Sequence, residues 1–322
     1  MSKKKIVFSI LLLGVTLVFE TLVSGPTWVL GAILDIVLIG TLATLLSRVF
    51  VRRVPFRAVL ERNIIFTSNV FWVFTLVLGI ALVVINSFPT SLSEVSLTDG
   101  KRKVIFMQMS HIATPRYYES VRDRLGELSR SGYEVYREWV LPGSPENHDR
   151  FDALLGVKIH SGTYDEIARL ISLEAQTDRI YESVASGSVS SVDLSIDEIM
   201  SLIPPSTSTG ETTIVDPSAE LARIAEASRG PLLPYVARAL LNLSLRYTHL
   251  SDVALDALDP SLRQAILDRR NSHIVDTLIA SPGQDVVIVY GALHFDGVYT
   301  LLQSRDTNWK VTNITPYFPY QP

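Results

Sequence analysis

Two histidines that end apolar runs are the first candidates for chemistry. His294 follows residues 286–290, which are rich in β-branched residues, and His111 ends a second apolar run that begins at Val104. Such runs are typical of strands buried on both faces. Neutral imidazole binds divalent transition metals and also acts as a general base near neutral pH. Because open α/β sheets place ligands at the carboxyl ends of their strands, we expect both histidines to converge on one site. The alternative is that each is a hydrogen-bonded core histidine.

Glu138 is the third candidate. It lies near the end of a predicted strand at 133–140, and it emerges at the same sheet edge as His111 if the two strands are neighbours joined by a right-handed crossover. A carboxylate beside two histidines suits either a metal site with open positions or a general base and its orienting partner. The alternative is a solvated strand-end charge paired with Arg137.

Arg270 and Asn271 lie on the predicted helix that leads into the strand at 286. Arginine is well shaped to clamp a carboxylate or a carbonyl oxygen, and asparagine can fix a substrate backbone. The alternative is the solvated face of a charged helix.

The elements that must position these residues form a predicted α/β or α+β domain with a central mixed sheet and inserted helices. We expect strands at 104–110, 133–140, 286–290 and 310–314, and helices at 116–129, 164–185, 219–227, 232–247 and 261–280. Residues 186–210, rich in Ser, Thr and Pro, are expected to form a loop with one short helix within 192–202.

Three apolar stretches, at 6–23, 28–46 and 64–85, are each long enough to be a transmembrane helix. Lysines at 3–5 and five arginines between the second and third stretches place the amino terminus and that loop in the cytoplasm. We therefore expect a three-helix anchor at 1–88, a polar linker at 89–100 and an extracytoplasmic domain at 101–322.

The composition excludes several classes of function for the predicted outer domain. The chain has no cysteine, which excludes a disulfide scaffold and thiolate chemistry. Residues 101–322 contain 21 basic and 28 acidic side chains, a net charge of −7, so we expect no nucleic-acid partner.

The carboxyl-terminal residues resemble a known family. Arg270 and Asn271 on a helix, a buried strand, then Gly-Ala-Leu-His at 291–294 and Gly297, are similar to the signature of the TraB/PrgY/GumN/TIKI superfamily. His111 and Glu138 fall where that family has its first Gly-x-x-His motif and a glutamate.

The resemblance covers about residues 103–310 and includes a Leu-Glu-Ala-Gln segment at 173–176. The chain departs from the pattern at Gln108, where the first motif has Gly, and at Arg269, where the family often has Glu. The family includes membrane-tethered metalloproteases and esterase-like hydrolases that work without metal.

The first functional hypothesis is a membrane-anchored hydrolase, a metal-dependent peptidase, that acts on a peptide or small molecule outside the cell. His111, Glu138 and His294 would hold Mn, Co or Zn, which lowers the pKa of a bound water, and Arg270 would steady the substrate or the oxyanion. Without metal, His111 and Glu138 would act as a base and its orienting partner in ester or amide hydrolysis.

The second hypothesis is a non-catalytic membrane sensor or regulator that binds a secreted peptide in the same cleft. The departures at Gln108 and Arg269 fit a site that has lost catalytic activity. A single helix is enough for an anchor, so three predicted helices favour a partner in the membrane or a homo-oligomer.

Overall fold

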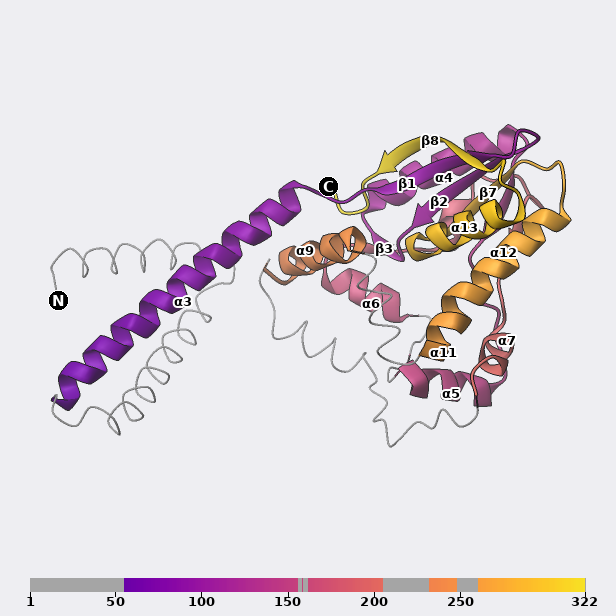
Figure 1. Cartoon of the computed structure of the whole chain (residues 1–322). Helices are drawn as coiled ribbons and strands as arrows, with labels where there is room; N and C mark the ends of the chain where they lie inside the picture. Colours follow the sequence, from indigo (N-terminus) through magenta and orange to yellow (C-terminus); the bar gives the residue numbers. More distant parts are fainter. Residues whose placement is uncertain (1–54, 156–157, 159–161, 205–231, 248–259, 322) are drawn as a thin grey trace. The chain divides into compact units, whose positions relative to one another are not determined.

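The computed structural model describes residues 55–155, 158, 162–204, 232–247 and 260–321 (Figure 1). The chain forms two compact units, one of Met1–Phe88 with Glu226–Ala239 and one of Pro89–Ala225 with Leu240–Pro322. The predicted helix at 219–227 lies outside the described residues. The predicted helix at 232–247 is confirmed as α9 (Leu232–Arg246), which contains the boundary between the units.

The described part of the first unit is dominated by α3 (Phe56–Ser87), a helix of 32 residues. Its segment Arg57–Ser87 is long and apolar enough to cross a membrane, by length and composition alone. Large apolar side chains such as Phe66, Val77 and Ile80 are exposed along it. The third expected span is therefore a continuous helix, and the expected spans at 6–23 and 28–46 lie outside the described residues.

The second unit is built on a six-stranded sheet with the order β6-β4-β7-β2-β1-β8. Strands β6, β4, β7 and β2 are parallel, and β1 and β8 are antiparallel additions at one side. The strands are β1 (Leu92–Thr98), β2 (Lys103–Met109), β4 (Glu134–Arg137), β6 (Val189–Ser191), β7 (Val286–Gly291) and β8 (Lys310–Tyr317). A mixed α/β domain with a central mixed sheet, as predicted, is confirmed.

Helices and two short strands complete this unit. They are β3 (Ile112–Ala113), α4 (Pro115–Arg130), α5 (Pro145–Leu155), α6 (Thr163–Leu170), β5 (Glu174–Ala175), the 3-10 turn η1 (Asp178–Tyr181), α7 (Ile196–Ser201), α11 (Pro260–Arg263), the π-helical turn η2 (Gln264–Asp268), α12 (Arg269–Ala280), the 3-10 turn η3 (Ala292–His294) and α13 (Phe295–Arg305).

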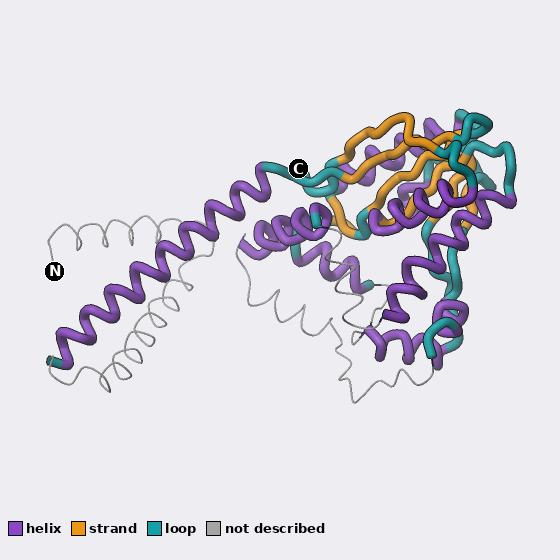
Figure 2. The backbone as a smooth tube through the Cα atoms, viewed as in Figure 1, coloured by secondary structure: helices purple, strands orange, loops and turns teal. Residues whose placement is uncertain are grey.

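The two central strands are apolar without alternation because helices cover both faces of the sheet. Phe106 and Ile288 pack against α12 and α13, whereas Met107 and Val289 pack against α4. Figure 1 shows α13 and α4 on opposite sides of the strands, which form one layer in Figure 2. Each face therefore has its own hydrophobic core, and the parallel strands lie between the two cores.

β2 ends near His111 and β4 ends near Glu138, but the two are not neighbours in the sheet, so the condition under which Glu138 was placed beside His111 is not met. β7 lies between β2 and β4 and pairs in parallel with both. Residues 286–290 of β7 are all buried, as expected for a strand inside the sheet. Because all three strands are parallel, their carboxyl ends still meet at one sheet edge.

Residues 89–100, predicted as a linker, instead contain β1. This strand pairs with β2 on one side and with β8 on the other, and its residues Leu92, Val95 and Leu97 are buried in the core. Polar Ser and Thr residues alternate with the buried apolar residues of this segment, so its composition resembles that of a linker although it forms a strand.

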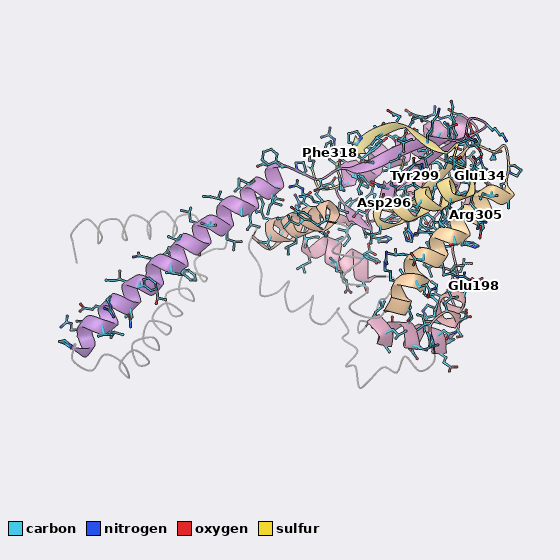
Figure 3. All side chains as sticks on the ribbon, in the orientation of Figure 1. Glu134, Glu198, Asp296, Tyr299, Arg305 and Phe318 are labelled. Atoms are coloured by element: carbon cyan, nitrogen blue, oxygen red, sulfur yellow. The ribbon has the colours of Figure 1, made fainter. Side chains whose placement is uncertain are left out.

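The helices predicted over 164–185 cover only part of this range. α6 stops at Leu170, and Ser172 has a φ of 56°, a left-handed conformation that a continuing helix does not permit. The chain then forms β5 and η1. The described part of the predicted loop at 186–210 contains β6, which was not predicted, and the expected short helix, α7. This helix begins with a capping box between Ser195 and Glu198, and Glu198 is labelled in Figure 3.

Candidate functional site

Polar side chains from the ends of all four parallel strands meet at one edge of the sheet. His111 follows β2, Glu138 follows β4, Asp193 follows β6 and His294 lies in η3 after β7. Arg270, from α12, contacts three of them. Glu138, Arg270 and His294 therefore lie in contact at this edge, and Asp193 is an additional member that was not among the predicted site residues.

Arg270 is the centre of this cluster. Its Nε donates to Asp193 Oδ1 at 2.7 Å, and its Nη2 donates to Asp193 Oδ2 at 2.7 Å and to Glu138 Oε1 at 2.6 Å. Its Nη1 lies 3.3 Å from His294 Nε2. Burial alone would lower the pKa of Arg270, but the two carboxylates raise it above its ordinary value. Arg270 is therefore a fixed, permanent cation at the floor of the site.

Asp193 binds the guanidinium of Arg270 through both of its carboxylate oxygens. Its side chain is completely buried and also accepts hydrogen bonds from the backbone N–H groups of Trp139, at 3.1 Å, and Leu194, at 2.8 Å. Four donors therefore satisfy this carboxylate, which is the condition for keeping a charge inside a protein.

The π-helical turn η2 ends directly before Arg269, and α12 continues from there. A π-turn adds a residue to the helix and rotates the following side chains, and such turns are frequent at functional sites. Here both Arg270 and Asn271 are buried, whereas Arg269 is exposed. The departure at Arg269 therefore places a charge in solvent and does not alter the site.

Asn271 orients His294. Its Oδ1 lies 2.7 Å from His294 Nδ1, and its Nδ2 lies against Gly297, where an added Cβ would come within 2.1 Å. An amide oxygen only accepts, so His294 Nδ1 carries the proton and Nε2 presents its lone pair to Arg270. Burial lowers the pKa of His294 to about 4, so this imidazole is neutral at pH 7.

Glu138 is an ionised carboxylate. Burial would raise its pKa, but Arg270, the two histidines and the backbone N–H of Gly291, which donates to Oε2 at 2.7 Å, hold that pKa at about 2. Glu138 therefore accepts hydrogen bonds at neutral pH and cannot serve as a general acid.

His111 differs from His294 in being exposed. Its ring lies against Tyr164, with centroids 5.0 Å apart, and its carbonyl accepts a hydrogen bond of 2.8 Å from the backbone N–H of Gln176. The hydroxyl of Tyr118 on α4 donates to the carbonyl of Ser110 and fixes the turn that carries His111. This imidazole is accessible from the cavity.

A cavity of about 940 Å³ lies at this edge of the sheet. His111, Glu138 and Arg270 line it, together with apolar side chains from the loop after β4 and from α5 and α7. Its volume is that of a binding site for an organic ligand. Asn271, predicted to bind substrate, does not line this cavity and instead supports His294.

The predicted metal ligands do not fit a metal ion in this arrangement. Glu138 Oε1 and His294 Nε2 lie 3.8 Å apart, and both are occupied by the guanidinium of Arg270. Within the described ranges, no three His, Asp, Glu or Cys side chains gather closely enough to hold a metal. The family resemblance would place a metal cation beside Glu138 and His294. The guanidinium of Arg270 already contacts both of these side chains.

Gln108, the other departure, has a structural role. Its Oε1 accepts a hydrogen bond of 2.8 Å from the backbone N–H of Ser93 and thereby ties β2 to the start of β1. The side chain is committed to the sheet and not to the candidate site.

The fold and the site define a class: a mixed α/β domain with a polar cluster at the carboxyl edge of its parallel strands, open to a ligand-sized cavity. No family model, no curated protein and no solved structure matches the chain.

Proposed function

We propose that this chain is a membrane-anchored hydrolase that cleaves an ester or amide bond with its own side chains. The observation that carries the proposal is the convergence of an accessible imidazole, His111, with the fixed cation Arg270 and the carboxylate Glu138 at the floor of one cavity. A general base beside an electrophilic donor is the minimum that hydrolysis of a carbonyl compound requires.

In this proposal His111 takes a proton from the attacking water. Neutral imidazole is suited to this near pH 7. His111 lines the cavity, and the electrostatic effect of Glu138 would stabilise the imidazolium that forms. His111 would then return the proton to the leaving group.

Arg270 would stabilise the oxyanion. A guanidinium has five N–H groups, and the contacts with Asp193, Glu138 and His294 use four of them. One N–H of Nη1 remains for a substrate oxygen. Because the other four contacts fix the group, it needs no reorganisation as negative charge develops.

His294, Glu138 and Asp193 would act mainly by holding Arg270. His294 Nε2 already accepts from Nη1, and the neutral ring adds no competing charge. This assigns different roles to the two histidines: His111 as the base and His294 as a positioning residue.

The membrane part of the proposal rests on sequence and on α3. We infer three transmembrane helices, with the amino terminus in the cytoplasm and the α/β unit outside, from the apolar stretches and the distribution of basic residues. The segment Arg57–Ser87 meets the length and composition of the third span.

The test is hydrolysis by the purified full chain in lipid nanodiscs, measured with a panel of chromogenic esters and fluorogenic peptide amides. We expect His111→Ala to reduce kcat/KM by roughly 10²- to 10⁴-fold, the usual contribution of a general base. The matched control is His273→Ala, since His273 is outside the cavity lining, and this variant should retain the rate.

Absence of hydrolysis across the panel, or an unchanged rate in His111→Ala, would overturn the proposal. The first result would favour the non-catalytic sensor. The metal-dependent peptidase is the other alternative, and it requires Arg270 to leave both Glu138 Oε1 and His294 Nε2 free for an ion.

A further inference from the structure

The cavity has an apolar wall next to its polar floor. Leu141 in the loop after β4, Phe151 on α5 and Ile199 on α7 all line it, as does Trp139, which is half exposed. Large apolar side chains that line one concave site, two of them exposed, are typical of ligand recognition. The ligand of this site should therefore have an apolar body.

Acidic side chains outnumber basic ones in the lining. Glu138, Asp165 and Asp178 contribute carboxylates, whereas Arg270 is the single Lys or Arg side chain of the described lining. Asp178 is paired with Arg137 at 3.2 Å, and Glu138 with Arg270 at 2.6 Å. A concave site with apolar walls focuses such a negative potential, which attracts cations and repels anions.

Two polar atoms at the lining are buried and have no hydrogen-bond partner in the part of the chain that the structure describes. They are Gln176 Oε1 and the hydroxyl of Tyr181. Gln176 is next to the proposed base, because its backbone N–H donates to the carbonyl of His111. Buried polar atoms are normally paired, so an unpaired acceptor at a cavity indicates a donor supplied by a ligand.

We infer that the substrate of this site has an apolar body and a positively charged hydrogen-bond donor, such as a primary ammonium, which binds Gln176 Oε1 in the negative field of the carboxylates. The inference rests on the proposed function, since it places this group beside His111, where the reaction would occur. A substrate with a carboxylate or phosphate is disfavoured.

Four probes of similar size separate these features. Phenethylammonium has the aromatic body, the charge and the donor; phenethyltrimethylammonium keeps the charge without the donor; 2-phenylethanol is neutral; and 3-phenylpropionate is an anion. Their dissociation constants for the full chain in nanodiscs would be measured by saturation-transfer NMR, with empty nanodiscs to correct for partition into lipid.

We expect phenethylammonium to bind about tenfold or more tightly than 3-phenylpropionate, with the difference shrinking as salt rises. Gln176→Met should remove the advantage of the primary over the quaternary ammonium, because it removes the acceptor at nearly constant volume. Asp165→Asn should weaken both cations, whereas Asp123→Asn, an equal charge change on an exposed residue of α4 outside the lining, should not.

Equal or tighter binding of the anion would overturn the inference, as would an unchanged preference in both Gln176→Met and Asp165→Asn. The measurement is independent of catalysis. Cation preference without hydrolysis of any ester or amide would refute the proposed function alone, whereas hydrolysis with preference for anions would refute this inference alone.

Discussion

At the scale of single residues, the site depends on one buried arginine between two buried carboxylates. The side chains of Arg270, Glu138 and Asp193 are all largely or completely buried. Such a group is stable only while every charge is paired, because an isolated buried charge loses its hydration without compensation.

Replacing Arg270 by methionine should therefore be strongly destabilising. The variant leaves Glu138 and Asp193 without their cation, and breaking a buried ion pair in this way costs about 3–5 kcal/mol. Urea unfolding would measure the loss. The control is Arg305→Met, which removes an exposed pair with Asp276 and should cost about 0–1 kcal/mol. Similar losses in the two variants would contradict the assigned role.

Stability should also depend on pH through His294. Its pKa falls from 6.5 in the unfolded chain to about 4 in the folded state, so between these values the unfolded chain binds a proton that the native state does not. Unfolding free energy should then decrease by about 3 kcal/mol as pH falls from 6.5 to 4. Glu138, with its pKa lowered from 4.5 to about 2, adds a further loss below pH 4.5.

The measurement is urea unfolding at several pH values, for the wild-type chain and for His294→Gln. Glutamine keeps polar atoms at this position but does not titrate, so the decrease between pH 6.5 and 4 should become smaller. An identical slope in both proteins would show that His294 is not the group responsible.

At the scale of elements, the contact between α12 and α13 sets the geometry of the imidazole. Gly297 on α13 lies so close to Asn271 on α12 that a Cβ would come within 2.1 Å of Asn271 Nδ2. The absence of a side chain at 297 therefore allows Asn271 to reach His294. This explains why a glycine three residues after His294 belongs to the site.

Gly297→Ala should displace Asn271 and destabilise the fold by about 1–3 kcal/mol, the usual cost of overpacking. It should also lower the hydrolysis rate, because His294 would lose its orienting partner. Gly162→Ala is the control, since a Cβ there meets no atom within 4 Å. Unfolding and rate would be measured for both, and wild-type values for Gly297→Ala would contradict the account.

The central strands β2 and β7, and the helix α4 that packs against them, were predictable from the sequence. Continuous apolar runs identified β2 and β7, and Pro115 and Gly132 marked the limits of α4. The order of the strands was not predictable, because β7 pairs between β2 and β4 through contacts far apart in the chain. A local pattern does not contain that information.

The site was predictable where a residue ended a recognisable strand. His111, Glu138 and His294 were found in this way, and Arg270 through the helix before β7. Asp193 was missed because β6 has three residues and is too short to give a periodic signal. The apolar Val192 directly before Asp193, in a Ser-rich segment, was the only local indication.

At the scale of the whole molecule, the proposed membrane anchor has a defined topology. The chain contains no cysteine, so a single introduced cysteine is a specific label. Val54→Cys, in the Arg-rich loop, should react with an impermeant maleimide only after cells are permeabilised. Asn308→Cys, in the exposed turn before β8, should react in intact cells. The reverse pattern would contradict the proposed orientation.

The most direct test of the central claim is the hydrolysis rate of the full chain after metal removal. Wild-type protein would be treated with chelator, desalted, and assayed on the ester and amide panel before and after addition of Zn, Mn or Co, with metal content measured in the same samples. Because Arg270 already occupies Glu138 and His294, we predict the same rate in all samples and no stoichiometric metal. Activity lost on chelation and restored with about one metal ion per chain would contradict the account.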